Sequence, residues 1–158
     1  MADDKAPMTP EGYSALQEEL KRLKQVERPK ISKEIGAAAA LGDLSENAEY
    51  HAARERAGFI EGRISELEAK IGNAQVIDPK LVDADGRCVF GATVDVESDG
   101  ESATWQIVGE DEADIKQGRI SVSSPIARAL IGKESGEVVE VQTPGGLKRY
   151  EIIDVRYE

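Results

Sequence analysis

Apolar residues recur at helical spacing through the first half of the chain. One stripe, interrupted by Pro29, takes in Leu16, Leu20, Leu23, Ile31, Ile35, Ala38 and Leu41. A second stripe, at alternating intervals of three and four, takes in Ala57, Ile60, Ile64, Leu67 and Ile71. Such spacing predicts helices that bury one face, and the alternation is typical of a coiled-coil seam. Because Pro29 lacks an amide hydrogen, it should bend or locally break the first helix.

Start and stop signals frame these stripes. Thr9 and Pro10 precede the first stripe, and Gly72 with Asn73 follows the second. Two helical arms of roughly 30 residues each, joined by a short polar segment, predict an antiparallel helical hairpin. At about 1.5 Å per residue it would extend on the order of 45 Å. The connecting segment, LGDLSENAEY at 41–50, would form its tip.

From about Val76 the pattern changes to short β-branched runs separated by Gly and Asp turns. These are strand signals, and VESDG and TPGG are good hairpin turns. RISVSSPIARALIGKESG predicts a strand, a turn at Ser124 and Pro125, and a short helix. The expected fold class is therefore an α-helical coiled-coil hairpin in residues 1–78, followed by an α+β domain in 79–158. That second domain should be a mainly antiparallel sheet with one helix.

Composition narrows the possible functions. The chain has 158 residues and a formal net charge of −11, and only 4% of its residues are aromatic. The acidic balance argues against a general duplex-DNA binder, because neutralising phosphates supplies most non-specific affinity. No apolar run approaches the roughly 20 residues of a membrane span. The first residues lack the apolar core of a secretion signal, so we expect a cytoplasmic protein without membrane partners.

Two residue types occur only once. A single cysteine, Cys88, excludes an internal disulfide and a multi-cysteine zinc site, and we expect it to be a small buried side chain. A single histidine, His51, has no other nitrogen or sulfur ligands nearby in the sequence. We therefore expect it on a helix surface rather than in a metal site.

The acids of the tip segment allow two interpretations. Asp43 and Glu46 have the spacing of a capping box, in which Asp43 would cap the second helix and Glu46 would reach back to it. Alternatively, carboxylates three residues apart can reach one hydrated cation. Mg²⁺ often takes only one or two carboxylates, with phosphates and waters completing its shell. Two exposed acids would then form half of a metal site, and a partner that holds phosphates would supply the rest.

Several ordered segments resemble one known family. LGDLSENAEYHAARE, NAQVID, GATV, SPIARALIGK and TPGG, within a match from MTPEGY to the end, resemble the bacterial GreA/GreB transcript-cleavage factors. The resemblance implies that the hairpin enters the secondary channel of RNA polymerase, while an FKBP-like second domain docks on the channel rim. Asp43 and Glu46 would help to hold the second Mg²⁺ of the polymerase and orient a water. The polymerase would then cleave the 3′ end of a backtracked RNA.

The resemblance also suggests roles for other residues. Leu44 and Ser45 would contact the channel wall, Tyr50 would support the tip, and Arg54 would face the nascent RNA. Arg56 could do the same, although both arginines could equally be solvated helix charges. The rim contact would consist of Ser123, Ser124, Pro125 and Ile126, or these could be a plain turn into a helix. Family members often carry basic residues where this chain has Ala39 and Ser45, so its basic patch is small.

Three alternatives follow from the same residues. A hairpin that only blocks the polymerase channel would inhibit transcription without cleavage, but the intact pair of Asp43 and Glu46 argues against this. A prolyl isomerase would need an aromatic-lined pocket, and the second domain offers only Phe90, Trp105, Tyr150 and Tyr157. A coiled-coil adaptor would be indifferent to both tip acids. We expect a monomer that binds Mg²⁺ only in the complex with polymerase and has no nuclease activity alone.

Overall fold

A computed structural model describes residues 5–43 and 46–158, so Leu44 and Ser45 lie outside the described residues. The chain divides into two compact units, one of residues 13–73 and the other of the described residues up to Gly12 together with Ala74–Glu158. The domain limits expected from the sequence, 1–78 and 79–158, stay a prediction. Within the described ranges, no helix is long and apolar enough to cross a membrane.

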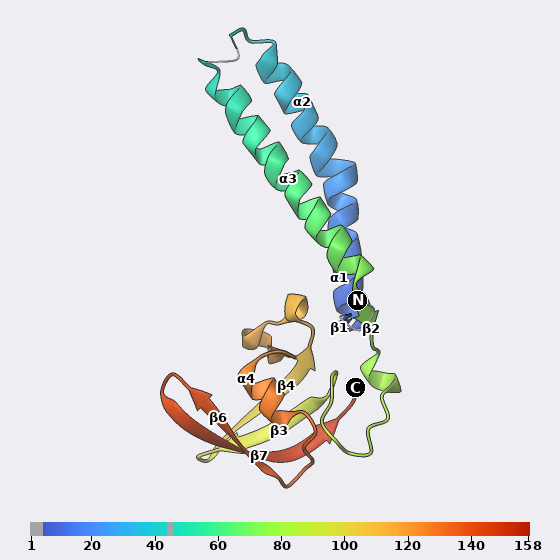
Figure 1. Ribbon diagram of the computed structural model, residues 1–158, viewed down its shortest axis with the longest axis vertical. Helices are drawn as coiled ribbons and strands as arrows, with labels where there is room; N and C mark the ends of the chain where they lie inside the picture. Colours follow the sequence, from blue (N-terminus) through green and yellow to red (C-terminus); the bar gives the residue numbers. More distant parts are fainter. Residues whose placement is uncertain (1–4, 44–45) are drawn as a thin grey trace. The chain divides into compact units, whose positions relative to one another are not determined.

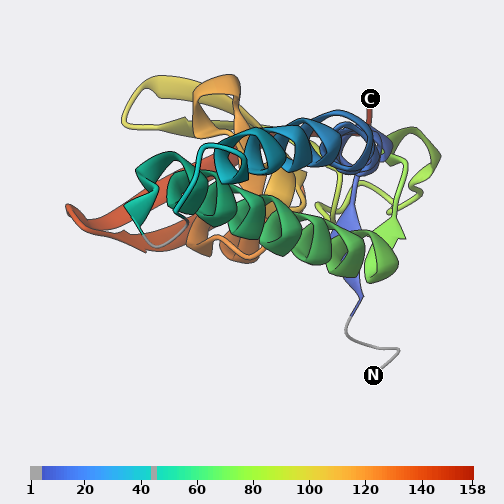
Figure 2. The same ribbon diagram turned by 90° about the horizontal axis from the view of Figure 1, so that it is seen from above.

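Residues 13–73 form the helical hairpin that the sequence predicts. Its elements are α1 (Pro10–Arg22, which begins in the other unit), a π-helical segment η2 (Leu23–Glu27), α2 (Arg28–Ala39) and α3 (Ala48–Gly72). Both views show α3 side by side with α2 and running back along it (Figure 1 and Figure 2).

The first arm passes Pro29 without breaking. Glu27 and Arg28 keep right-handed helical backbone angles, with φ near −71° and −60°. Arg28 donates its backbone N–H to the carbonyl of Leu23, five residues earlier, which is the π-helical pattern. Pro29 cannot donate a hydrogen bond to the preceding turn. Just before it, the bonds therefore span five residues instead of four, and the α-helix then continues. The predicted local disturbance at Pro29 therefore takes the form of a π-helical segment within a continuous helical arm.

The buried residues of the hairpin, among those that the structure describes, are Leu16, Leu23, Ile31, Ala38, Ala53, Ile64 and Leu67. All except Ala53 belong to the predicted stripes, and the predicted Leu20, Ile35, Ala57, Ile60 and Ile71 are half-buried. Leu41, also in a predicted stripe, is 71% exposed. The prediction that it continues the buried stripe was wrong, because α2 ends at Ala39 and the chain has already left the helix at Leu41.

The second unit contains the predicted, mainly antiparallel sheet. Its strands are β1 (Ala6–Met8), β2 (Ala74–Val76), β3 (Thr93–Ser98), β4 (Glu101–Val108), β5 (Arg119–Ser121), β6 (Val138–Thr143) and β7 (Gly146–Arg156). Its helical segments are η4 (Pro79–Leu81), η5 (Glu110–Glu112), η6 (Ile115–Gln117) and α4 (Pro125–Leu130). Five strands form one sheet in the order β5-β4-β3-β7-β6, antiparallel except for β4 with β5. The turn between β3 and β4 falls at Asp99 and Gly100, both with positive φ, as VESDG predicts.

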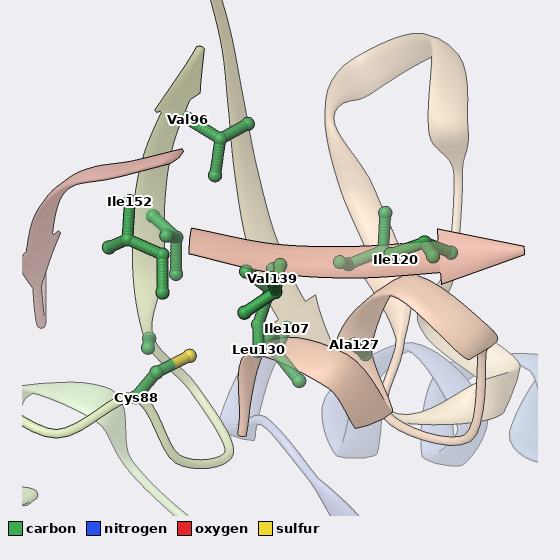
Figure 3. Close-up of a cluster of buried hydrophobic side chains, with 11 residues drawn as sticks. Cys88, Val96, Ile107, Ile120, Ala127, Leu130, Val139 and Ile152 are labelled. Carbon is green, nitrogen blue, oxygen red and sulfur yellow. The ribbon is translucent and has the colours of Figure 1, made fainter. Parts of the chain in front are cut away.

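The core of this unit lies between the sheet and α4. Figure 3 shows Ala127 and Leu130 of α4 facing sheet residues such as Ile107 and Val139. Cys88 is fully buried in the same cluster, which confirms the prediction for it. Burial raises the pKa of the Cys88 thiol to about 12, since a thiolate is poorly solvated there.

A second, two-stranded sheet ties the N-terminal segment to this unit. β1 pairs in parallel with β2, and the carboxylate of Glu112 accepts hydrogen bonds from the backbone N–H of Thr9 at 2.9 Å and from the Thr9 hydroxyl. Thr9 Oγ1 in turn accepts from the N–H of Gly12 at 3.2 Å, which confirms Thr9 as the N-cap of α1. A Cβ on Gly12 would clash with the Glu112 carboxyl, so a larger residue there would displace this hydrogen-bonded side chain.

Candidate functional site

The tip of the hairpin lies between the end of α2 at Ala39 and the start of α3 at Ala48. Asp43 and Glu46, the two acids expected to hold a metal ion, are both exposed there. Leu44 and Ser45, expected to contact the channel wall, lie outside the described residues. The positions of the two acids thus permit contact with a partner that reaches the end of the hairpin.

The capping interpretation of the acids was wrong for α3. The N-cap of this helix is Asn47, whose Oδ1 accepts a hydrogen bond from the backbone N–H of Tyr50 at 3.0 Å. Neither Asp43 nor Glu46 occupies the cap position. The spacing was misleading because both Asp43 and Asn47 are good cap formers, and the helix begins after the second of them.

The first arm of the hairpin ends in a tight turn. Ala40 and Leu41 donate their N–H groups to the carbonyls of Gly36 and Ala38, at 3.2 and 3.1 Å. Gly42 follows with a φ of +129°, a backbone conformation that residues with a Cβ rarely adopt. The Nδ2 group of Asn47 also reaches this turn and donates to the Ala38 carbonyl at 2.6 Å. Asn47 therefore contacts the ends of both helices.

Asn47 was not among the residues singled out from the sequence. The available signal was its type and place, since asparagine directly before a helical stretch is one of the preferred N-caps. What the sequence could not supply is the second bond, because Ala38 lies nine residues away on the other arm.

Tyr50 and Arg54 lie one turn apart on α3. The Arg54 guanidinium donates to the Tyr50 hydroxyl at 3.0 Å, and its central carbon is 5.8 Å from the ring centroid. The hydrogen bond to Tyr50 raises the pKa of Arg54 above its usual value. His51 is exposed, as expected, with its ring 5.5 Å from that of Tyr50 in an edge-to-face arrangement. Tyr50 thus orients an exposed cation close to the tip.

Arg56, the other candidate for an RNA contact, has a partner in the hairpin itself. Its guanidinium forms an ion pair with Glu34 of α2 at 2.8 Å. Both residues border an open groove of about 520 Å³ between α2 and α3, which is lined by Glu34, Ala37, Ala38, Leu41, Glu49, Ala52, Ala53 and Arg56. The ion pair links the two arms below the tip.

The tip acids that the structure describes, Asp43 and Glu46, offer two exposed carboxylates as possible metal ligands. Among residues 5–43 and 46–158, no group of three or more His, Cys, Asp or Glu side chains could hold a metal ion. Two exposed carboxylates suit Mg²⁺, which commonly takes one or two carboxylates and fills its octahedral shell from substrate phosphates and water. Asp43 and Glu46 therefore have the ligand chemistry that the Mg²⁺ expectation requires, and the binding of the ion stays a prediction.

The four residues expected at the polymerase rim lie at the start of α4. Ser124 is the N-cap: its Oγ accepts from the N–H of Ala127 at 3.3 Å and donates to the Ser121 carbonyl at 2.7 Å. Ser123 and Pro125 are exposed, whereas Ile126 is half-buried against the core. The structure thus gives Ser124 and Ile126 roles within the fold, and Ser123 and Pro125 face the solvent.

Comparison with known proteins finds similar sequences over most of the chain. Residues 6–76 match the family model "Transcription elongation factor, N-terminal", and residues 83–157 match "Transcription elongation factor, GreA/GreB, C-term". Transcription elongation factor GreA of Alkalilimnicola ehrlichii is 63% identical over 155 residues, which are 97% of this chain and 98% of that protein. The GreA of Methylococcus capsulatus is 60% identical over 156 residues, covering 98% and 99%. The crystal structure of GreA factor homolog 1 of Thermus thermophilus is 25% identical, covers 96% of this chain and 99% of its own, and has a TM-score of 0.44.

Proposed function

Since the chain belongs to the GreA/GreB family of transcription elongation factors, we propose that it stimulates RNA polymerase to cleave backtracked RNA. The observation that carries the proposal is the exposure of Asp43 and Glu46 at the end of the hairpin, where Asn47 and not either acid caps α3. An exposed pair of carboxylates on a slender helical arm suits insertion into a channel with phosphates at its end.

In the proposed mechanism, the hairpin enters the secondary channel of RNA polymerase and brings Asp43 and Glu46 to the active site. In two-metal phosphoryl chemistry, the ions activate the attacking water and stabilise the developing charge. The carboxylates of Asp43 and Glu46 would supply ligands for the second Mg²⁺ of the polymerase and accept a hydrogen bond from the attacking water. The chain would thereby complete a site that belongs to the polymerase, and it would have no nuclease activity alone.

Contacts outside the tip complete the proposal. Ser123 and Pro125, the exposed pair at the start of α4, would touch the channel rim, with Ser124 and Ile126 holding their loop. Arg54 would face the 3′ segment of the nascent RNA, because its guanidinium is exposed and oriented by Tyr50. Arg56 suits this role less well, since it is paired with Glu34. The factor would act in the cytoplasm as a monomer.

The experiment measures RNA 3′-end cleavage in stalled, backtracked elongation complexes with Mg²⁺. It compares no factor, the wild type, Asp43→Ala and Glu46→Ala, with polymerase binding measured in parallel. Each variant should lose at least about tenfold in cleavage rate, which corresponds to about 1.4 kcal/mol of transition-state stabilisation. Glu49→Ala is the matched control, because Glu49 is an exposed acid in the first turn of α3.

Glu49→Ala should cleave like the wild type if the effect depends on Asp43 and Glu46 and not on negative charge at the tip. A wild-type protein that binds polymerase but does not stimulate cleavage would overturn the proposal. It would leave a regulator that acts by blocking the channel.

A further inference from the structure

The two helices of the hairpin are joined at its tip end by one side chain. Asn47 Oδ1 accepts from the N–H of Tyr50 in the first turn of α3, and Asn47 Nδ2 donates to the carbonyl of Ala38 in the last turn of α2. The backbone carbonyl of Asn47 also accepts from the N–H of His51 at 3.1 Å. We call the two helix ends at Ala38 and Asn47 the neck of the tip.

The partners determine which way the Asn47 amide points. The N–H of Tyr50 can only donate and the carbonyl of Ala38 can only accept, so rotating the amide by half a turn would lose both bonds. Among the residues that favour N-cap positions, only asparagine carries a separate acceptor and donor on a short planar group. Aspartate could cap α3 but could not donate to Ala38 when ionised, and a serine hydroxyl is too short to serve both helix ends.

Among residues 5–43 and 46–158, apolar packing supplies little at the neck. The buried residues described near it are alanines, Ala38 and Ala53, and the neighbouring Leu41 is 71% exposed. An open groove lies between the two arms at this level. Burial free energy scales with apolar area, so a pair of alanines gives only weak resistance to opening or sliding of the helix ends. The hydrogen bond from Asn47 to Ala38 is directional and fixes both spacing and register.

We propose that Asn47 is a positioning residue that closes the neck and so holds Asp43 and Glu46 in the arrangement needed to share one metal ion. Glu46 directly precedes Asn47 in the chain, and Asp43 follows the turn whose carbonyl Asn47 binds. Fixing the neck therefore fixes the two ends of the tip segment. This inference rests on the proposed function, because it assigns Asn47 a role in presenting the same two acids.

The functional test separates binding from cleavage. Asn47→Asp keeps an acceptor for the cap but loses the donor to Ala38, and Asn47→Ser loses the same donor without adding charge. For both variants, the factor concentration that gives half-maximal cleavage should stay within about twofold of wild type, since the proposed rim contacts are untouched. The maximal cleavage rate should fall by about tenfold or more, because misplacing a reacting group by about 1 Å can cost up to on the order of 100-fold.

Asn73→Asp is the matched control, with the same atomic change at the other end of α3, and it should cleave like the wild type. A maximal rate within twofold of wild type for both Asn47 variants, while Asp43→Ala is inactive, would overturn the positioning role. Loss of stimulation by the wild type itself would instead overturn the proposed function.

A second measurement tests the neck without polymerase. In the free, isotope-labelled protein, a scalar coupling across the hydrogen bond should connect the Asn47 side-chain nitrogen to the Ala38 carbonyl carbon. The same coupling should be lost in Asn47→Asp, while far-ultraviolet circular dichroism shows unchanged helix content. Absence of the coupling in the folded wild type would overturn the inference even if cleavage depends on Asn47.

Discussion

The base and the tip end of the hairpin differ in how much apolar surface is buried between the two arms. Towards the base, large apolar side chains such as Leu23, Ile64 and Leu67 are buried between the arms. Towards the tip, only the small side chains of Ala38 and Ala53 are buried among the described residues. Directional bonds link the arms at both ends, but those near the tip, from Asn47 to Ala38 at 2.6 Å and from Arg56 to Glu34 at 2.8 Å, have little apolar burial beside them.

This difference separates stability from geometry. Apolar burial is strong but non-directional, so at the base it supplies most of the free energy that holds the arms together. Hydrogen bonds add little net free energy each but depend steeply on distance and angle. In the proposed function, a narrow tip linked by such bonds would enter the channel and present Asp43 and Glu46 in a defined arrangement. Side-chain truncations at the base should mainly change the free energy of unfolding, whereas truncations of the exposed tip acids should mainly change activity.

The largest effect on stability is expected from a substitution in the apolar packing at the base of the hairpin. Leu67 is fully buried, so Leu67→Ala should lower the free energy of unfolding by about 2–5 kcal/mol, through lost burial and the cavity left behind. Urea denaturation followed by circular dichroism measures this. Leu41→Ala makes the same change at a residue that is 71% exposed, and it should change the free energy by less than about 0.5 kcal/mol. Equal losses for the two variants would contradict the comparison of base and tip.

The sequence predicted the structural features that follow from the periodic spacing of apolar residues. The seam residues, the two hairpin arms and the alternating strands of the sheet all repeat at intervals that report which face is buried. It did not predict what depends on one distant partner. Glu112 binds Thr9 across 103 residues, and Asn47 binds Ala38 on the opposite arm. No local pattern records such pairings.

The tip shows why local rules can choose wrongly. Asp43 with Glu46 matches a capping box, yet α3 starts after Asn47. The residue at which α3 begins depends on where α2 ends and on the turn through Gly42. Local helix propensity does not determine either of these. The metal-binding role of Asp43 and Glu46 stays a prediction, since it needs a partner outside this chain.

An intermediate effect on stability is expected from a substitution in the turn at the tip. Gly42 has a φ of +129°, so Gly42→Ala should cost about 1–3 kcal/mol of local backbone strain. Gly36 lies inside α2, where an added Cβ would meet no heavy atom within 4 Å, so Gly36→Ala should stabilise by about 0.5–1 kcal/mol. Thermal unfolding and amide hydrogen exchange at residues 38–41 measure both. A stabilising Gly42→Ala would show that the turn carries no strain-sensitive conformation.

The smallest expected effect concerns an ion pair towards the base. Arg63 donates two hydrogen bonds to Glu19, at 2.8 and 2.9 Å, and this pairing lowers the pKa of Glu19 below its usual value of 4.5. A lowered pKa in the folded state means that the contribution is complete above about pH 5 and is lost as the pH falls through the folded-state value. Since such part-exposed pairs contribute about 0.2–1 kcal/mol, Glu19→Gln should cost no more than this at neutral pH, and less at high salt.

Denaturation of both proteins from pH 7 to pH 3 should show the difference in their free energies of unfolding shrinking as the pH falls. A difference that is independent of pH would contradict a contribution from the charge of Glu19, because Gln keeps the methylene groups of Glu and lacks only the titratable carboxylate.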